Sequence, residues 1–155
     1  MRAVFAAASM ILPETFTVEL CQWSEEGPAL SSLRHSIFVL EQKVPPEIEV
    51  DSLDPECVHA IARDSDGRAI GTGRLIPGEL PRIGRMAVVR SWRRSGVGAQ
   101  ILKLLCEEAK RRGYAEVMLH SQTHATPFYF RHGFLSHGAE FLEAGIPHQE
   151  MRKKL

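Results

Sequence analysis

Apolar and polar residues alternate in several short stretches, a pattern typical of strands with one buried face. The first stretch runs from Phe16 to Gln22. Two more, Cys57–Arg63 and Arg68–Ile76, are joined by Asp-Ser-Asp-Gly, and Asp-Gly tolerates the positive φ of a tight hairpin turn. A fourth runs from Leu80 to Val89. Because the connections among the last three are short, the pattern predicts an antiparallel meander.

Two longer segments have apolar residues at helical spacing. The first predicts a helix from Pro28 to about Gln42, since proline suits a first turn and Pro45-Pro46 ends the segment. The second predicts a helix over Ala99–Arg112 that stops at Gly113. The apolar positions are Leu30, Leu33, Ile37 and Leu40 in the first helix and Ile101, Leu104, Leu105 and Ala109 in the second.

The remaining segments complete a mixed sheet. The strand-like run Ala115–Gln122 follows the second helix, and a crossover of this length implies a parallel or splayed neighbour for the fourth strand. A short helix over Thr126–His132 and two strands, Phe134–Phe141 and Pro147–Lys153, follow. We therefore expect one α/β (α+β) domain over residues 1–155, with a mixed central sheet flanked by helices.

Composition narrows the class of protein. The 155 residues are enough for one domain with a sizeable core. The 19 lysines and arginines balance the 19 aspartates and glutamates, which argues against a general nucleic-acid or membrane-surface binder. Three widely spaced cysteines favour a reducing, cytoplasmic compartment. The histidines from His120 to His137 match no compact ligand set, so we expect no metal.

The first residues need separate treatment. Arg2 and a short apolar stretch faintly resemble a signal peptide, but Ser9 interrupts the stretch and the cysteine usage does not look secreted. We therefore expect residues 1–14 to form an arm ahead of the first strand.

The stretch Arg93–Gly98 lies between the fourth predicted strand and the second predicted helix. Gly96 and Gly98 let the backbone turn tightly and approach a ligand closely. The helix that follows presents unpaired N–H groups and the positive end of its dipole, and Arg93 and Arg94 add charge. This combination predicts a site for a phosphate or pyrophosphate. It fits neither a P-loop nor a dinucleotide fingerprint, which would need a third glycine.

The pattern Arg-x-x-Gly-x-Gly resembles the acyl-CoA-binding motif of the GNAT N-acetyltransferase superfamily. Phe-Tyr-x-x-x-Gly-Phe, from Phe128 to Phe134, resembles the C-terminal half of the same superfamily. The first half of the chain, and Gly145–His148 near its end, are similar to the ElaA-like branch. The residues of the first half that carry this similarity are Arg34, Phe38, Glu41, Gln42, Val44, Pro45, Glu47, Glu49, Asp51, Asp54 and His59.

The resemblance implies the GNAT acyl-CoA N-acyltransferase fold with acetyl-CoA as cosubstrate. It also implies that the fourth strand diverges from the fifth, leaving backbone N–H groups to polarise the thioester carbonyl. Tyr129 is the expected general acid for the leaving thiolate, because a phenol is still protonated at neutral pH. We expect cofactor contacts from Met86, Ala87, Val88, Arg93, Arg94, Ser95, Gly96, Val97, Gly98, Gln122 and Tyr129.

A base must accept the proton of the amine, and the residues leave several candidates open. Glu41, His120 and His148 are the expected catalytic candidates, with Glu49 and Asp51 also considered. The acidic run from Glu47 to Glu56 has two interpretations: a solvated loop, or a pocket wall in which Glu49 and Asp51 bind a cationic substrate. Its spacing does not fit an EF-hand.

Two functions of different classes follow. The first is transfer of an acetyl group from acetyl-CoA to a primary amine of a small molecule or a protein. The second is a non-catalytic acyl-CoA-binding sensor or interaction module with the same fold. Tyr129 favours the enzyme. The acceptor and the oligomeric state stay open, with a homodimer among the alternatives, and we expect no nucleic-acid or membrane partner.

Overall fold

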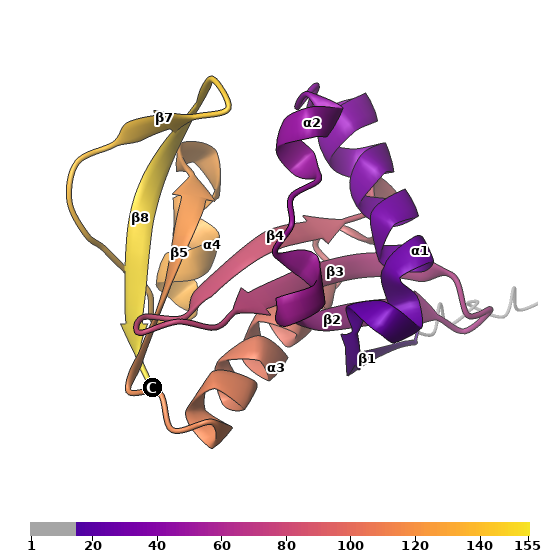
Figure 1. The fold of residues 1–155 in the computed structure, drawn as a ribbon, viewed down its shortest axis with the longest axis horizontal. Helices are drawn as coiled ribbons and strands as arrows, with labels where there is room; N and C mark the ends of the chain where they lie inside the picture. The colour runs from indigo at the N-terminus through magenta and orange to yellow at the C-terminus, as the bar shows by residue number, and fades with distance from the viewer. Residues whose placement is uncertain (1–14) are drawn as a thin grey trace, which may run out of the picture.

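The structure of the chain is a computed structural model that describes residues 15–155. The predicted N-terminal arm, residues 1–14, lies outside the described residues. Eight strands form one mixed sheet in the order β1-β2-β3-β4-β5-β8-β6, with β7 paired to β8 (Figure 1). Their bounds are β1 (Phe16–Gln22), β2 (Val58–Asp64), β3 (Ala69–Ile76), β4 (Arg82–Val88), β5 (Glu116–Gln122), β6 (Leu135–Ser136), β7 (Phe141–Glu143) and β8 (Ile146–Lys154). The predicted antiparallel meander, β2-β3-β4, is confirmed.

Helices cover both faces of the β1–β4 half of the sheet, α1 (Trp23–Arg34) on one and α3 (Val97–Arg111) on the other (Figure 1). Two neighbours on β2 show the alternation that this requires. Ala60 packs in the cluster that contains the apolar face of α3, and Ile61 packs against Leu30 of α1. The sheet is therefore buried on both sides in this half, as the apolar content of its strands indicates.

The first helix differs from the prediction. It starts at Trp23, so Pro28 lies inside it, and it continues as a π-helical segment, η1 (His35–Glu41). A π-helical turn takes more residues than an α-helical one, so it rotates the following side chains away from the α-helical face. The expected apolar face therefore ends at Ile37, and the Leu40 side chain is 59% exposed.

The strands β4 and β5 run parallel and pair at Arg82–Met118 and Ile83–Leu119. Beyond these pairs they diverge (Figure 1), as the resemblance implied. On its other side, β4 pairs with β3 with a shift in register between Thr72 and Arg74. Arg85 lies at this bulge with a φ of +51°. A bulge of this kind redirects a side chain to the other face of the sheet.

The C-terminal part also departs from the sequence prediction. The expected strand Phe134–Phe141 is two short strands, β6 and β7, separated by a segment that contains Gly138 with a φ of +77°. That turn lets both strands pair with β8. The short helix α4 (Thr126–Arg131) precedes them, and α2 (Pro46–Glu49) follows the π-helical segment.

Candidate active site

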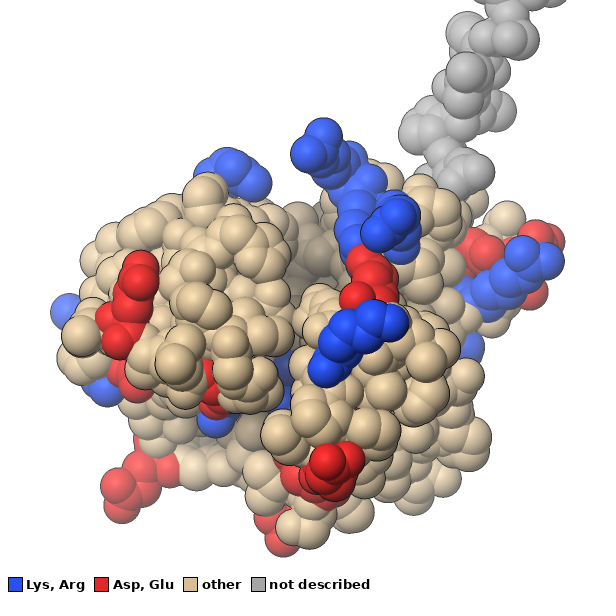
Figure 2. Space-filling view, turned by 90° about the horizontal axis from the view of Figure 1, so that it is seen from above, with Lys and Arg blue, Asp and Glu red and all other residues tan. Residues whose placement is uncertain are grey.

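A cavity of about 440 Å³ opens where β4 and β5 diverge. Its walls come from β3, β4 and β5, from the α2 region and from the β7–β8 hairpin. Viewed from above, the surface is hollowed between two parts of the molecule (Figure 2). The predicted residues Met86, Gln122, Glu49, Asp51, Tyr129, His120 and His148 all line this cavity.

The glycine loop lies at the start of α3, as predicted. Gly96 precedes the helix with a φ of +91° and a ψ of 0°, in the left-handed region, and no side chain caps the helix end. A Cβ at Gly96 would meet no atom within 4 Å, whereas one at Gly98 would lie 3.6 Å from the Phe128 ring. The unpaired N–H groups of the first turn thus begin beside open space, which suits an anionic group, although the residues of Arg93–Gly98 are not among those that line the cavity.

The arginines of this loop are engaged differently from the expectation. Both terminal nitrogens of Arg93 donate to the Glu41 carboxylate, at 2.6 and 2.9 Å, and its Nε donates to the Val88 carbonyl. The hydrogen bond from Arg93 lowers the pKa of Glu41. A carboxylate held in this way is a weak base, so we do not retain Glu41 as a catalytic base. The pair instead ties η1 to the glycine loop.

Three carboxylates of the acidic run are bound by two arginines, the buried Arg34 and Arg74, which lines the cavity. Arg34 donates to Glu49 at 2.5 Å and to Asp54 at 2.7 Å, and Arg74 donates to Asp51 and Asp54. Because Glu49 and Asp54 are buried, the interpretation of the run as a solvated loop is wrong for them. Glu49 and Asp51 line the cavity, but their charges are shared with arginines rather than free for a cation.

Tyr129 extends from α4 into the cavity wall, packed against Phe128 and Phe134. Burial raises the pKa of its phenol to about 12. Among the residues that the structure describes, none is hydrogen-bonded to this hydroxyl. The phenol therefore stays protonated across the physiological range and has its proton available to a group in the cavity.

His120 and His148 both contact Glu143, a residue that the sequence analysis did not identify. His120 Nδ1 lies 3.1 Å from Glu143 Oε1, and His148 Nε2 lies 3.5 Å from Glu143 Oε2. Burial would raise the pKa of Glu143, but the hydrogen bond from His120 and the charge of Arg82 outweigh it and lower the pKa. Glu143 is therefore ionised and can stabilise a protonated histidine. The sequence offered one sign of Glu143: it directly precedes the turn at Ala144-Gly145, so it lies at the end of the β7–β8 hairpin.

The two histidines differ in the hydrogen-bond partner of the ring nitrogen that does not face Glu143. His148 Nδ1 donates to the Ile146 carbonyl at 2.7 Å, so both of its nitrogens have partners. His120 Nε2 lies 3.9 Å from Glu150 Oε1, beyond hydrogen-bond distance, and its side chain is partly exposed in the cavity. When Nδ1–H of His120 donates to Glu143, Nε2 keeps its lone pair for a proton.

Backbone and amide groups complete the site. Beyond Ile83 the β4 edge that faces β5 has left the β5 ladder, and Met86 lines the cavity there, whereas the predicted contacts Ala87 and Val88 are not among the lining residues. Gln122 Nε2, at the end of β5, donates to Gln42 Oε1 at 2.9 Å and spans this opening. Gln42 was not assigned a role from the sequence, although it belongs to the run that carries the family resemblance.

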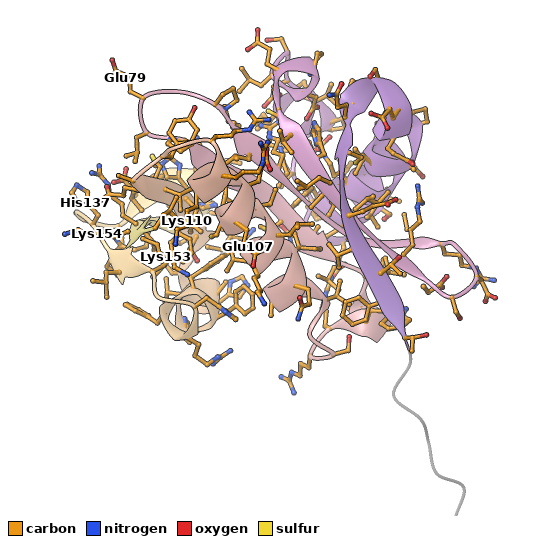
Figure 3. All side chains as sticks on the ribbon, turned by 90° about the horizontal axis from the view of Figure 1, so that it is seen from below. Glu79, Glu107, Lys110, His137, Lys153 and Lys154 are labelled. Carbon is orange, nitrogen blue, oxygen red and sulfur yellow. The ribbon has the colours of Figure 1, made fainter. Side chains whose placement is uncertain are left out.

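A second cavity, of about 390 Å³, lies on another face, beside α3 and the end of β8. Lys110, Lys153, Lys154 and Glu107 surround it (Figure 3). Within residues 15–155, no group of three or more His, Cys, Asp or Glu side chains is arranged to hold a metal ion. In the same part of the chain, no helix has the length and apolar character needed to cross a membrane.

Comparison with known proteins finds similarity to one family of acyltransferases. Residues 37–155 match the sequence model of the acetyltransferase (GNAT) domain. The chain is 39% identical over 123 residues to the Bacillus subtilis (strain 168) protein named Uncharacterized N-acetyltransferase YjcF, over 78% of this chain and 87% of that protein. An acyl-CoA N-acyltransferase from Pseudomonas aeruginosa superimposes with a TM-score of 0.79 at 31% identity, over 90% of this chain and 99% of that one. Escherichia coli ElaA superimposes with a TM-score of 0.80 at 27% identity, over 88% and 99%, which confirms the ElaA-like resemblance.

Proposed function

The chain belongs to the acetyltransferase (GNAT) family, and from this premise we propose that it moves an acetyl group from acetyl-CoA to a primary amine of a small molecule or a protein. The observation that carries the proposal is the cavity between the diverging strands, where the free edge of β4, Tyr129 and His120 converge. Each of these supplies one requirement of the reaction, as follows.

The residues at the start of α3 fit the pyrophosphate of acetyl-CoA. The left-handed backbone at Gly96 and the open space beside it expose the first N–H groups of a 15-residue helix. Arg94 is exposed beside the loop, whereas Arg93 is held by Glu41. Acetyl-CoA supplies the activated acyl group, a thioester, when bound. The free β4 edge near Met86 is placed to donate hydrogen bonds to an oxygen that gains negative charge.

Tyr129 supplies a proton at the thiol end of the reaction. Because burial raises the pKa of the phenol to about 12, the hydroxyl is protonated at neutral pH. Its lack of a hydrogen-bond partner among the described residues leaves it free to donate into the cavity. The departing thiolate, the conjugate base of a thiol with a pKa near 8.5, can accept its proton from such a donor.

His120 is the base that we propose for the acceptor amine. Its Nδ1 is fixed by Glu143, and its Nε2 is near Glu150. When Nε2 gains a proton, the imidazolium ring lies between Glu143 at Nδ1 and Glu150 near Nε2, and both carboxylates stabilise its charge. His148 holds Glu143 from the other side and acts as a positioning residue.

The test is thiol release from acetyl-CoA in the presence of a panel of amines, with acetyl-CoA affinity measured by calorimetry alongside. We expect amine-dependent release of CoA and a mass increase of one acetyl group on the accepted amine. Binding of acetyl-CoA without turnover on any amine would instead identify the non-catalytic sensor.

A further inference from the structure

The cavity wall carries equal numbers of positive and negative side chains. Its carboxylates are each bound by an arginine: Asp51 by Arg74, Glu49 by Arg34, which is buried behind the wall, and Glu143 by Arg82. With Arg85 added, the charged side chains that line the cavity are Arg74, Arg82 and Arg85 against Glu49, Asp51 and Glu143. A wall with balanced charges does not select a cation. It suits an acceptor that carries one positive and one negative group.

Arg85 faces the cavity because of the bulge in β4. Ile83 packs in the cluster on the α3 side of the sheet, and Met86 Sδ lies beside Gly73 on that same side. Strict alternation would send the side chain at 85 to the α3 side with Ile83. The extra residue at the bulge places Arg85 next to Gly84 on the cavity side instead. A Cβ at Gly84 would meet no atom within 4 Å, so open space adjoins Arg85.

One terminal nitrogen of the Arg85 guanidinium is hydrogen-bonded to the α2 region, and the other has no partner among the described residues. Its Nη2 donates to the Ile48 and Glu49 carbonyls and to Asp51, at 3.1 to 3.3 Å. Its Nη1 donates to none of the described residues, and 24% of the side chain is exposed. Burial, and then the charge of Arg74, lowers the pKa of Arg85. The surrounding carboxylates therefore do not fully offset its charge, and an added anion would.

We propose that the acceptor is an amine that also carries a carboxylate, that is, a compound of the amino-acid class, and that Arg85 binds this carboxylate. The inference rests on the proposed acetyl transfer and names its substrate class. Arg85 is on the α2 side of the cavity, and the His120–Glu143 pair is on the β7–β8 side. An acceptor spanning the two sides has its amino group at His120 and its carboxylate at Arg85, where Nη1 completes a charge-assisted hydrogen bond.

The test compares amino acids with their own primary amides, which differ by the carboxylate alone. We expect the wild-type protein to acetylate the acids with a kcat/KM about 10- to 100-fold above that of the amides, the range expected for a hydrogen bond to a charged group. In Arg85→Ala this acid-to-amide ratio should fall toward one. Arg63→Ala is the matched control, because Arg63 is also 24% exposed and also pairs with a carboxylate, Glu26, outside the cavity. It should keep the ratio.

Two further variants keep the inference testable if Arg85→Ala does not fold. Arg85→Gly tolerates the left-handed backbone, so it keeps the bulge if Arg85→Ala does not fold. Gly84→Val needs no unusual φ and adds bulk in the space beside Arg85, so it should raise KM for the acids more than for the amides. An acid-to-amide ratio that is near one in the wild type, or unchanged in the Arg85 variants, overturns the inference and leaves acetyl transfer standing.

Calorimetry separates this inference from the proposed function. If no amine is acetylated although acetyl-CoA binds, acetyl transfer fails, and the CoA-bound protein is titrated with the same acids and amides. Binding of the acids that is lost in Arg85→Ala then supports the carboxylate site by itself. Absence of binding by any acid in the panel, or equal binding by both Arg85→Ala and wild type, overturns it.

Discussion

At the scale of single residues, chemistry depends on which groups hold a proton at neutral pH. Tyr129 holds one because its ring is buried among aromatic side chains, while Glu143 has lost one because His120 and Arg82 face it. In the proposed reaction the two therefore act at opposite ends, Tyr129 as the proton donor and Glu143 as the anion that supports the base.

Tyr129→Phe removes the hydroxyl and preserves the ring. Since general acid catalysis typically contributes about 10² to 10⁴ in rate, we expect kcat to fall within that range while the affinity for acetyl-CoA changes much less. Tyr114→Phe is the control, because Tyr114 is the other tyrosine and packs against the core away from the cavity. Steady-state kinetics of both variants test whether Tyr129 is the general acid. A wild-type kcat in Tyr129→Phe would show that Tyr129 only packs in the cavity wall.

Glu143→Gln keeps the shape of the side chain and removes its charge. Without the anion, protonation of the base is less favourable, so the acid limb of the kcat/KM profile should move to lower pH and kcat should decrease by about tenfold or more. Glu140→Gln, an exposed carboxylate in the same segment, should leave the profile in place. If the limb stays where it is in Glu143→Gln, the base is not the histidine that Glu143 contacts.

At the scale of elements, the glycine loop, the β4 bulge and the diverging strands each set one part of the site. The loop presents the start of α3, the bulge directs Arg85, and the divergence of β4 from β5 frees a strand edge. All three are departures from regular structure, and such departures are common where a protein binds a ligand.

Gly96→Val tests the loop. A residue with a Cβ in the left-handed region costs about 1–2 kcal/mol, so the loop should relax out of this geometry and weaken acetyl-CoA binding by about tenfold or more. Gly67→Val is the control, because it introduces the same backbone strain away from the loop. Gly67 has a φ of +82° and equally open surroundings in the β2–β3 turn. We expect calorimetry to show weaker binding in the first variant alone, and equal affinities in both would contradict the assignment of the loop.

At the scale of the whole molecule, a buried cluster of charges joins parts of the chain that are distant in sequence. Asp54 accepts hydrogen bonds from Arg34 of α1 and from Arg74 of β3, and all three side chains are buried. The cluster fixes the α2 region over the sheet, and that region forms one wall of the candidate active-site cavity.

Asp54→Asn should destabilise the protein strongly, because it leaves two buried arginines without their shared anion. Breaking a buried pair in this way typically costs about 3–5 kcal/mol. The free energy of unfolding, from urea titrations, should decrease by an amount in this range. Glu26→Gln, which removes a partly exposed partner of Arg63, should cost about 1 kcal/mol or less. A similar small loss in Asp54→Asn would show that solvent reaches the cluster.

The sequence by itself determined the features that short-range patterns encode. Strand alternation predicted the meander, since side chains of a strand point to opposite faces in turn. The pair of glycines before an apolar helical run predicted the loop at the start of α3, because such a turn needs residues that tolerate positive φ. The spacing of Phe128 to Phe134 placed Tyr129 in the family pattern, and the structure puts it at the cavity.

Only the tertiary structure decided how the charged side chains are partnered. Arg34 and Asp54 are 20 residues apart, and Arg82 and Glu143 are 61 apart, so no local pattern links them. The sequence therefore left the acidic run as either a solvated loop or a wall for a cation, and only the fold shows that arginines neutralise it. The bulge that directs Arg85 and the π-helical turn that exposes Leu40 likewise depend on the register between packed elements. Local propensity fixes where elements begin and end, but pairing between distant charges is set by packing, which the chain specifies only as a whole.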